Sequence, residues 1–276
     1  MKRLYLSDLD GTLFTTQKKL TENTVRLLNE SIEKGALFAV ATARMPYGCD
    51  YRLTELNINA PSILTNGVFL YDFAKKSFLS VKTIPATAVH QVLEIFERFQ
   101  TGVFLYTFSE DKISLYYNLP EMTEQTQYYS DKAIASCRTI ECRSDLGALA
   151  EKSPAVYLAC TGPKEALEPL CEEVQKIDGI ACAFYLNIYN GLYCIEIFSD
   201  TATKRNALLE LKQMLGCDEV IVFGDNLNDL SMIEVAERSY AVENALEVVK
   251  QKATGVIPSC NEDGVATFIH KEVCGD

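Results

Sequence analysis

The chain has 276 residues, of which 48% are hydrophobic and 23% are charged, ordinary values for a globular protein with one large or two moderate domains. Its formal net charge is −12, which argues against general binding to nucleic acid or to anionic membranes, because both need a basic surface. The charge does not argue against a small phosphorylated ligand, because a local cation can outweigh the global field.

The first part of the chain alternates between short apolar runs and an amphipathic stretch. In chain order we expect a strand at 4–6, a helix over 25–32 capped by Thr21 or Thr24, a strand at 36–41 and a strand at 62–64. The run at 36–41 lacks polar alternation, which suits a parallel strand covered on both faces. This order favours right-handed crossovers and a Rossmann-like parallel sheet.

The alternation of strands and helices then ends, and a different structural unit is predicted from Pro85 onward. A hairpin precedes it, with strands at 68–71 and 78–81. Beyond it we expect helices at 88–99, within 121–135 and at 164–177, and strands at 102–108, 112–117, 155–161, 180–186 and 192–198. We interpret residues 84–189 as an inserted α+β domain of ordinary size.

The strand–helix alternation returns after Asp200. The expected elements are helices at 203–215, 227–236, 246–251 and 264–270, with strands at 219–223, 239–242 and 255–257. The first of these helices is closed by Gly216. The fold class is therefore α/β, with a discontinuous domain made of residues 1–83 and 190–276.

The sequence shows no export signal and no apolar run of the roughly 20 residues that would span a bilayer. Ten cysteines are present, and none has the CxxC spacing of common zinc or redox sites. We therefore expect a cytoplasmic protein whose cysteines are reduced.

Four polar clusters directly follow predicted strands. They are Asp8-Leu9-Asp10-Gly11-Thr12, Thr42-Ala43-Arg44, Asn66-Gly67, and Gly224-Asp225-Asn226-Leu227-Asn228-Asp229. Ligands of open parallel sheets bind outside the carboxyl ends of the strands, so we expect the four clusters to converge on one pocket.

The first cluster places two carboxylates close together. Asp8 and Asp10 repel each other unless a cation or a proton intervenes, and Gly11 lets the backbone leave the strand sharply. Taken alone, the segment could also be an ordinary Asp-Gly turn.

In combination, the clusters resemble a known family. Residues 8–13 after an apolar strand resemble the first signature of the haloacid dehalogenase-like (HAD) phosphatases, and residues 224–229 resemble the last. Thr42 and Lys204 follow in the order that this family requires, although Ala43 stands where it usually has Gly. The position of the insert, as a cap domain, and the segments 244–245 and 262–265 resemble the Cof-type subgroup.

The resemblance implies the roles of the catalytic residues. Asp8 would be the nucleophile that forms an aspartyl-phosphate, and Asp10 would be the general acid and then the general base. Mg²⁺ would be bound by Asp8, by Asp10 through its backbone carbonyl, and by Asp225, with Asp229 in the outer shell or in direct contact.

Phosphate would be bound by Thr42, Lys204 and Asn228, the last of which could instead lie near the metal. Arg44 could bind substrate or pair with surface acids, and Asn66 could contact substrate or form an ordinary turn. His90 and His270 lie away from every signature, which argues against a histidine mechanism.

The predicted function is hydrolysis of small phosphate monoesters, with sugar phosphates as the leading class. The partner would be a small phosphorylated metabolite, with no nucleic acid and no membrane. Two alternatives stay open: a phosphomutase of the same superfamily, and a non-catalytic sensor of phosphorylated metabolites. A sensor would have no need of the general acid Asp10.

Overall fold

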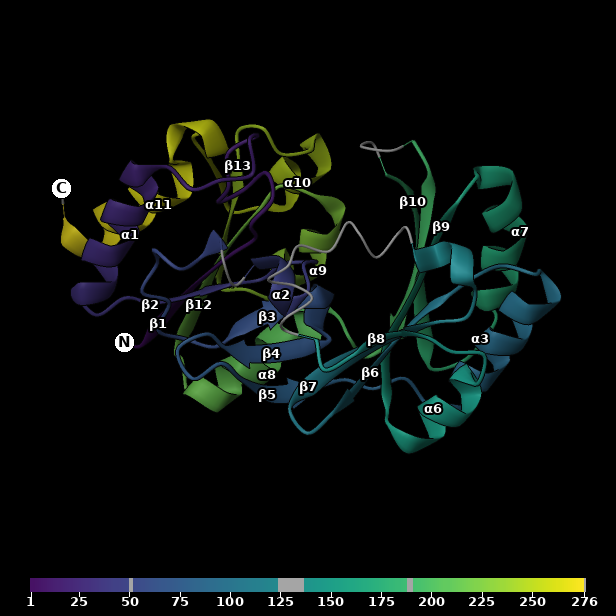
Figure 1. Cartoon of the computed structure of the whole chain (residues 1–276). Coiled ribbons are helices and arrows are strands. Elements are labelled where there is room, and N and C mark those ends of the chain that lie inside the picture. Colours follow the sequence, from purple (N-terminus) through teal and green to yellow (C-terminus); the bar gives the residue numbers. More distant parts are fainter. Residues whose placement is uncertain (50–51, 124–136, 188–190, 276) are drawn as a thin grey trace. The chain divides into compact units, whose positions relative to one another are not determined.

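The computed structural model describes residues 1–49, 52–123, 137–187 and 191–275. The chain divides into two compact units, one formed by Met1–Ser80 with Thr203–Asp276 and the other by Val81–Ala202 (Figure 1). The first unit is therefore discontinuous in sequence, and the second is inserted into it.

The first unit is built on a five-stranded parallel sheet with the order β14-β13-β12-β1-β2. Its strands are β1 (Arg3–Ser7), β2 (Leu37–Val40), β12 (Glu219–Gly224), β13 (Arg238–Val242) and β14 (Gly255–Ile257). After β1 the chain continues to β2 on one side, and after the insertion it returns to β12 on the other. The strand order thus reverses between β1 and β12, where ligands of such sheets bind. The predicted α/β fold class is confirmed.

The helices of this unit are α1 (Glu22–Glu33), α2 (Pro46–Cys49), α8 (Lys204–Leu215), α9 (Leu230–Ile233), α10 (Glu247–Lys252) and α11 (Gly264–Cys274). Of the two expected caps, Thr21 is the residue that precedes α1, and its hydroxyl accepts a hydrogen bond from the Thr24 amide. Helices α1 and α11 pack side by side (Figure 1). Helix α8 ends at Gly216, whose left-handed backbone confirms the predicted C-terminal cap.

A small sheet with the order β3-β4-β5 also belongs largely to the first unit. Its strands are β3 (Ser62–Leu64), β4 (Phe69–Asp72) and β5 (Ser77–Val81), and the predicted hairpin corresponds to β4 and β5. The expectation of a further parallel strand here is met in part. Strand β3 joins the parallel sheet through an isolated parallel bridge between Ala41 and Ile63, and on its other edge it pairs antiparallel with β4.

The second unit is an α+β layer with a six-stranded sheet in the order β10-β11-β9-β6-β7-β8. The strands are β6 (Phe104–Ser109), β7 (Lys112–Tyr117), β8 (Ile140–Cys142), β9 (Ala155–Gly162), β10 (Ile180–Leu186) and β11 (Tyr193–Ser199). Helices α3 (Ala86–Arg98), α6 (Leu146–Lys152) and α7 (Lys164–Val174) lie on one face of this sheet (Figure 1). Their apolar side chains form the core of the unit with those of the sheet.

This unit differs from expectation in one of its boundaries and in some of its elements. Residues 190–202 were expected in the α/β domain, but β11 pairs antiparallel with both β9 and β10 and so completes the second sheet. Strand β8 and helix α6 were not anticipated. The helix expected within 121–135 falls mostly outside the described residues, which show only the short η3 (Pro120–Met122) there.

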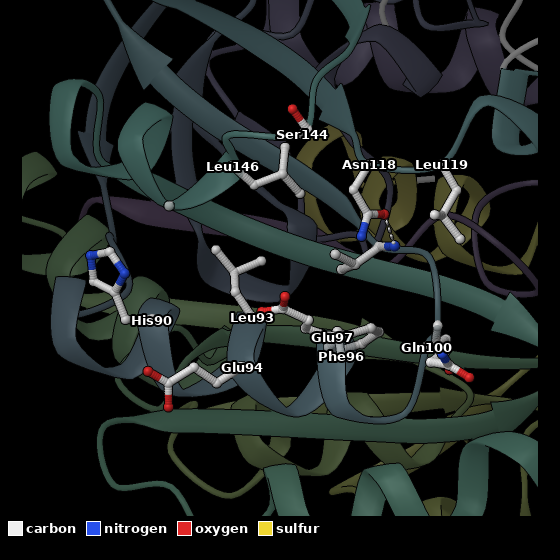
Figure 2. A pocket seen from close by; sticks show the side chains of 13 residues that line it. His90, Leu93, Glu94, Phe96, Glu97, Gln100, Asn118, Leu119, Ser144 and Leu146 are labelled. Carbon is white, nitrogen blue, oxygen red and sulfur yellow. Dashed lines mark hydrogen bonds between the residues drawn. The ribbon is translucent and has the colours of Figure 1, made fainter.

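A pocket of about 550 Å³ lies within the second unit. Figure 2 shows His90, Glu94 and Glu97 along α3 on one wall, with Asn118, Ser144 and Leu146 facing them. It contains none of the predicted site residues.

Within the described chain, every helix is too short or too polar to cross a membrane. The ten cysteines, all in described positions, are free thiols.

Candidate active site

A buried ammonium group joins two carboxylates at the carboxyl ends of β1 and β12. Asp8 follows β1, and its amide donates to the Phe223 carbonyl of β12 at 2.9 Å. Lys204, the first residue of α8, donates from Nζ to Asp8 Oδ1 at 2.6 Å and to Asp229 Oδ1 at 2.7 Å. The exposed fractions of Asp8, Lys204 and Asp229 are 5%, 1% and 0%. Lys204 is therefore a buried member of this group and not a solvated helix residue.

The electrostatics of this group follow from burial and close charges. Burial raises the pKa of the Asp8 carboxyl, and the Lys204 ammonium opposes that rise. Burial alone would lower the pKa of Lys204, but the Asp229 and Asp8 carboxylates raise it, so the amine stays charged. Burial raises the pKa of Asp225 to about 6, and Asp229 adds to the effect. One ammonium therefore faces three carboxylates, which leaves an excess of negative charge.

The loop after β12 fixes Asp225 through Asp229. Asp229 Oδ2 accepts from the amides of Asp225 and Asn226 at 2.9 and 3.1 Å. The Thr12 hydroxyl donates to Asp225 Oδ1 at 3.0 Å. Gly11 has φ +82°, and a Cβ added there would lie 2.6 Å from Asp225 Oδ2. The glycine is thus required by its backbone conformation and by the close approach of Asp225.

Three of the four predicted metal ligands form one oxygen-rich group. Carboxylate oxygens of Asp8, Asp225 and Asp229 all lie within 4.8 Å of one another. A hard cation such as Mg²⁺ prefers oxygen ligands and would offset the excess negative charge, so this donor set fits it. Among the described residues, the Asp10 side chain is not part of the group. The expected contribution of Asp10 was its backbone carbonyl, which this grouping of side chains does not test.

Asp10 and Arg44 form a bidentate ion pair. Arg44 donates from Nε to Asp10 Oδ2 and from Nη2 to Asp10 Oδ1, both at 2.6 Å. Arg44 Nη1 also donates to the Gly48 carbonyl at 3.3 Å. The side chain of Asp10 is 41% exposed and that of Arg44 is 19% exposed. Of the two interpretations of Arg44, the structure shows pairing with an acid, and this acid belongs to the site.

Thr42, Asn66 and Asn228 form a connected chain of polar groups. The buried Thr42 accepts at its hydroxyl from the Arg44 amide at 3.1 Å, and its carbonyl accepts from the Asn66 amide at 3.0 Å. The exposed Asn228 donates from Nδ2 to Asn66 Oδ1 at 3.3 Å. All nine predicted site residues thus belong to the first unit, in one group around Lys204 and another around Thr42 and Arg44.

Sequence reasoning gave no role to Asn244, which anchors the first cluster. Its Nδ2 donates to the Gly11 carbonyl at 2.7 Å, and its Oδ1 accepts from the Cys260 amide at 2.9 Å. Thr12 was likewise given no role of its own, although its hydroxyl donates a hydrogen bond to Asp225. The resemblance of segment 244–245 to the Cof-type subgroup was the one signal that could have drawn attention to Asn244.

A family model for haloacid dehalogenase-like hydrolases matches residues 5–269. The chain therefore belongs to the haloacid dehalogenase-like hydrolases. The predictions of a Cof-type family member and of a phosphatase are confirmed. The pyridoxal phosphate phosphatase YbhA of Escherichia coli is 25% identical over 274 residues, which are 98% of both chains.

Two solved structures show the same fold. A Thermotoga maritima protein has a TM-score of 0.79 at 23% identity and covers 98% of this chain and 97% of its own. The sugar phosphatase BT4131, described as HAD subclass IIB, has a TM-score of 0.71 at 20% identity and covers 99% of this chain and 100% of its own. At these identities the likeness concerns the fold.

Proposed function

We propose that this chain is a magnesium-dependent phosphatase that hydrolyses small phosphate monoesters through an aspartyl-phosphate on Asp8. The observation that carries the proposal is the buried Lys204 ammonium, which contacts both Asp8 and Asp229 beside the carboxylate of Asp225. A purely structural ion pair would not need a third carboxylate beside it, because unbalanced buried charge is destabilising.

The first half-reaction forms a bond between Asp8 and phosphorus. Lys204 holds Asp8 Oδ1, so we assign the attack to Oδ2. As the bond from Oδ2 to phosphorus forms, the bond from phosphorus to the leaving oxygen breaks, and Asp10 gives its proton to that oxygen. Lys204 stabilises the negative charge of the phosphoryl group during the transfer.

The second half-reaction regenerates the enzyme. Asp10, now a carboxylate, takes a proton from water as the water oxygen attacks phosphorus. The bond from phosphorus to Asp8 then breaks, and inorganic phosphate leaves with the oxygen that came from water. Asp8 returns to its ionised form beside Lys204, ready for the next substrate.

Asp8, Asp225 and the backbone carbonyl of Asp10 would hold Mg²⁺. The ion would offset the repulsion between the anionic Asp8 and an anionic phosphate. Both oxygens of Asp229 already accept hydrogen bonds from Lys204 and from the loop amides. We therefore assign Asp229 chiefly to holding Lys204 and Asp225 in place, rather than to direct coordination.

In addition to Lys204, we propose Thr42 and Asn228 as phosphate-binding residues. Asn228 is exposed and its amide is oriented by Asn66, so Asn66 would contribute to substrate binding through Asn228. The bidentate pair with Arg44 occupies both carboxylate oxygens of Asp10 in this structure. To bind substrate, Arg44 would therefore have to release at least one of these hydrogen bonds.

We propose small phosphorylated metabolites as substrates, with sugar phosphates as the leading class. The names of two similar proteins support this range, since one acts on pyridoxal phosphate and the other is a sugar phosphatase. The second unit would select the leaving group, as inserted domains of hydrolases often do.

The proposal is tested by phosphate release from p-nitrophenyl phosphate and from a panel of phosphorylated metabolites. Wild-type protein should turn over in Mg²⁺ and stop in EDTA, and Asp8→Asn should be inactive. The exposed Asp200→Asn serves as a matched control and should keep wild-type activity. Isomerised products without phosphate release would indicate a mutase, and binding without turnover would indicate a sensor. Either result, or turnover by Asp8→Asn, would overturn the proposal.

A further inference from the structure

Three consecutive residues after β3 adopt left-handed backbone conformations. They form η2 (Thr65–Gly67), with φ +51° at Thr65, +52° at Asn66 and +108° at Gly67. Asparagine and glycine accept such angles readily, but a β-branched threonine does so rarely. Backbone strain of this kind persists only where the surrounding structure imposes it, and it gathers at functional sites.

One side of this turn holds the segment that carries Thr42 and Arg44. The Asn66 amide donates to the Thr42 carbonyl at 3.0 Å, and the Thr65 amide donates to the Arg44 carbonyl at 3.0 Å. The Thr65 hydroxyl reaches the same Arg44 carbonyl at 3.4 Å. Successive amides can point at this segment because the left-handed backbone turns them to the same side.

The other side of the turn supports the start of α8. A Cβ added at Gly67 would lie 2.4 Å from the Thr203 carbonyl oxygen and 2.9 Å from the Thr203 nitrogen. Thr203 caps α8, because its hydroxyl accepts from the Asn206 amide at 3.0 Å. The next residue is Lys204, so the backbone of Gly67 contacts the point from which Lys204 extends to Asp8.

We propose that Thr65–Asn66–Gly67 is a positioning element of the active site, a role that rests on the proposed phosphatase function. The turn sets the start of α8, and therefore the place of the Lys204 ammonium, relative to the Thr42 segment. Lys204 is fully buried and contacts both partners within 2.7 Å, so it has little freedom to correct a shift of its backbone. The absence of a side chain at Gly67 is what permits this contact.

The test compares Gly67→Ala with Gly35→Ala. Gly35 has φ +100°, close to that of Gly67, but among the described residues nothing beyond its chain neighbours lies within 4 Å of an added Cβ. Both variants therefore carry the same backbone strain, and Gly67→Ala alone displaces Thr203. A misplacement of about 1 Å can lower catalysis by about 100-fold.

We expect Gly67→Ala to lower kcat by at least about 30-fold while KM changes less than about threefold, and Gly35→Ala to keep kcat within about twofold. Equal kcat values for the two variants would overturn the proposal. Thr65→Val provides a second variant in case Gly67→Ala does not fold. It keeps the β-branched shape but removes the hydroxyl contact with the Arg44 carbonyl, so kcat should fall by about threefold or more, and an unchanged kcat would overturn the role of Thr65 in the turn.

A crystal structure of Gly67→Ala separates this proposal from the proposed function. If wild-type protein releases no phosphate, the function fails, but the positioning of Lys204 can still be measured. We expect the distance from Lys204 Nζ to Asp8 Oδ1 to exceed the 2.6 Å of the present structure by about 1 Å. An unchanged distance would overturn the positioning role whatever the activity.

Discussion

Arg44 engages both carboxylate oxygens of Asp10, each at 2.6 Å, through a planar guanidinium that matches the carboxylate in shape. In the proposed reaction Asp10 must present an oxygen to the leaving group, and the pair with Arg44 occupies both of its oxygens. Hydrogen bonds of unliganded sites often rearrange in the complex with substrate. Arg44 would then exchange at least one Asp10 oxygen for a substrate oxygen.

Arg44→Gln tests this exchange. If Arg44 binds substrate, the variant should raise KM by roughly 10- to 100-fold, the usual worth of a charge-assisted hydrogen bond, while kcat falls less than about threefold. Arg26→Gln, which removes an exposed arginine paired with Glu30, is the matched control and should change neither constant. A fall in kcat as large as that of Asp10→Asn, with KM unchanged, would assign Arg44 to the acid rather than to substrate.

Lys204→Met tests the buried charge cluster through stability. The variant leaves two buried carboxylates without their shared cation, so we expect the free energy of unfolding in EDTA to fall by about 3–5 kcal/mol at neutral pH. Lys212→Met on the same helix removes a more exposed pair with Glu237 and should cost less than about 1 kcal/mol. Similar losses for the two variants, measured by urea unfolding, would show that the cluster is not stabilised by Lys204.

Asp225→Asn should stabilise the metal-free protein. The folded pKa of Asp225 is about 6, above its ordinary value, so ionisation of this carboxyl destabilises the fold as the pH rises through that range. The variant should therefore raise Tm in EDTA at neutral pH and have little effect near pH 4, where the wild-type carboxyl is protonated. Mg²⁺ should raise the Tm of the wild-type protein and not that of the variant. A lower Tm for the variant in EDTA would contradict this account.

Asp263 gives a pH dependence of the opposite sign, away from the site. Burial tends to raise its pKa, but hydrogen bonds from Thr21, Asn23 and Thr24 outweigh this and lower it. Its stabilisation is therefore present above the unfolded pKa, about 3.9, and is lost as the pH falls through the lower folded value.

Asp263→Asn isolates this charge, because asparagine keeps the left-handed backbone at φ +55°. We expect it to lower the free energy of unfolding by about 1 kcal/mol at neutral pH, since a partly exposed charge is screened. The difference from wild type should shrink in acid unfolding curves below about pH 4. A difference that stays constant down to low pH would point to the lost acceptor rather than to the charge.

The sequence predicted the position of the site best where polar residues directly follow apolar runs that form parallel strands. Asp8 and Asp225 follow continuous apolar runs, and parallel strands with long crossovers bring such ends to one edge of a sheet. Gly11, Gly67 and Gly216 mark left-handed positions that a side chain would strain. The parallel sheet and most of its helices could therefore be predicted without any tertiary information.

Other features depend on pairing between distant segments. The second boundary of the insert could not be placed from the residues of β11 alone, because its pairing with β9 and β10 determines where this strand belongs. The three residues of β3 are too few to show whether the neighbour is parallel or antiparallel. The pair between Arg44 and Asp10 is a choice of side-chain conformations, which no spacing in the sequence encodes.

The most direct test of the central claim is mass spectrometry of the tryptic peptide 4–18 after an acid quench during turnover. Asp10→Asn should slow hydrolysis of the intermediate, so this variant should accumulate one phosphoryl group on Asp8, which hydroxylamine removes as expected of an acyl phosphate. Asp8→Asn should show no such modification. Phosphate release by Asp10→Asn with peptide 4–18 unmodified throughout, or with the phosphoryl group on another residue, would contradict the account.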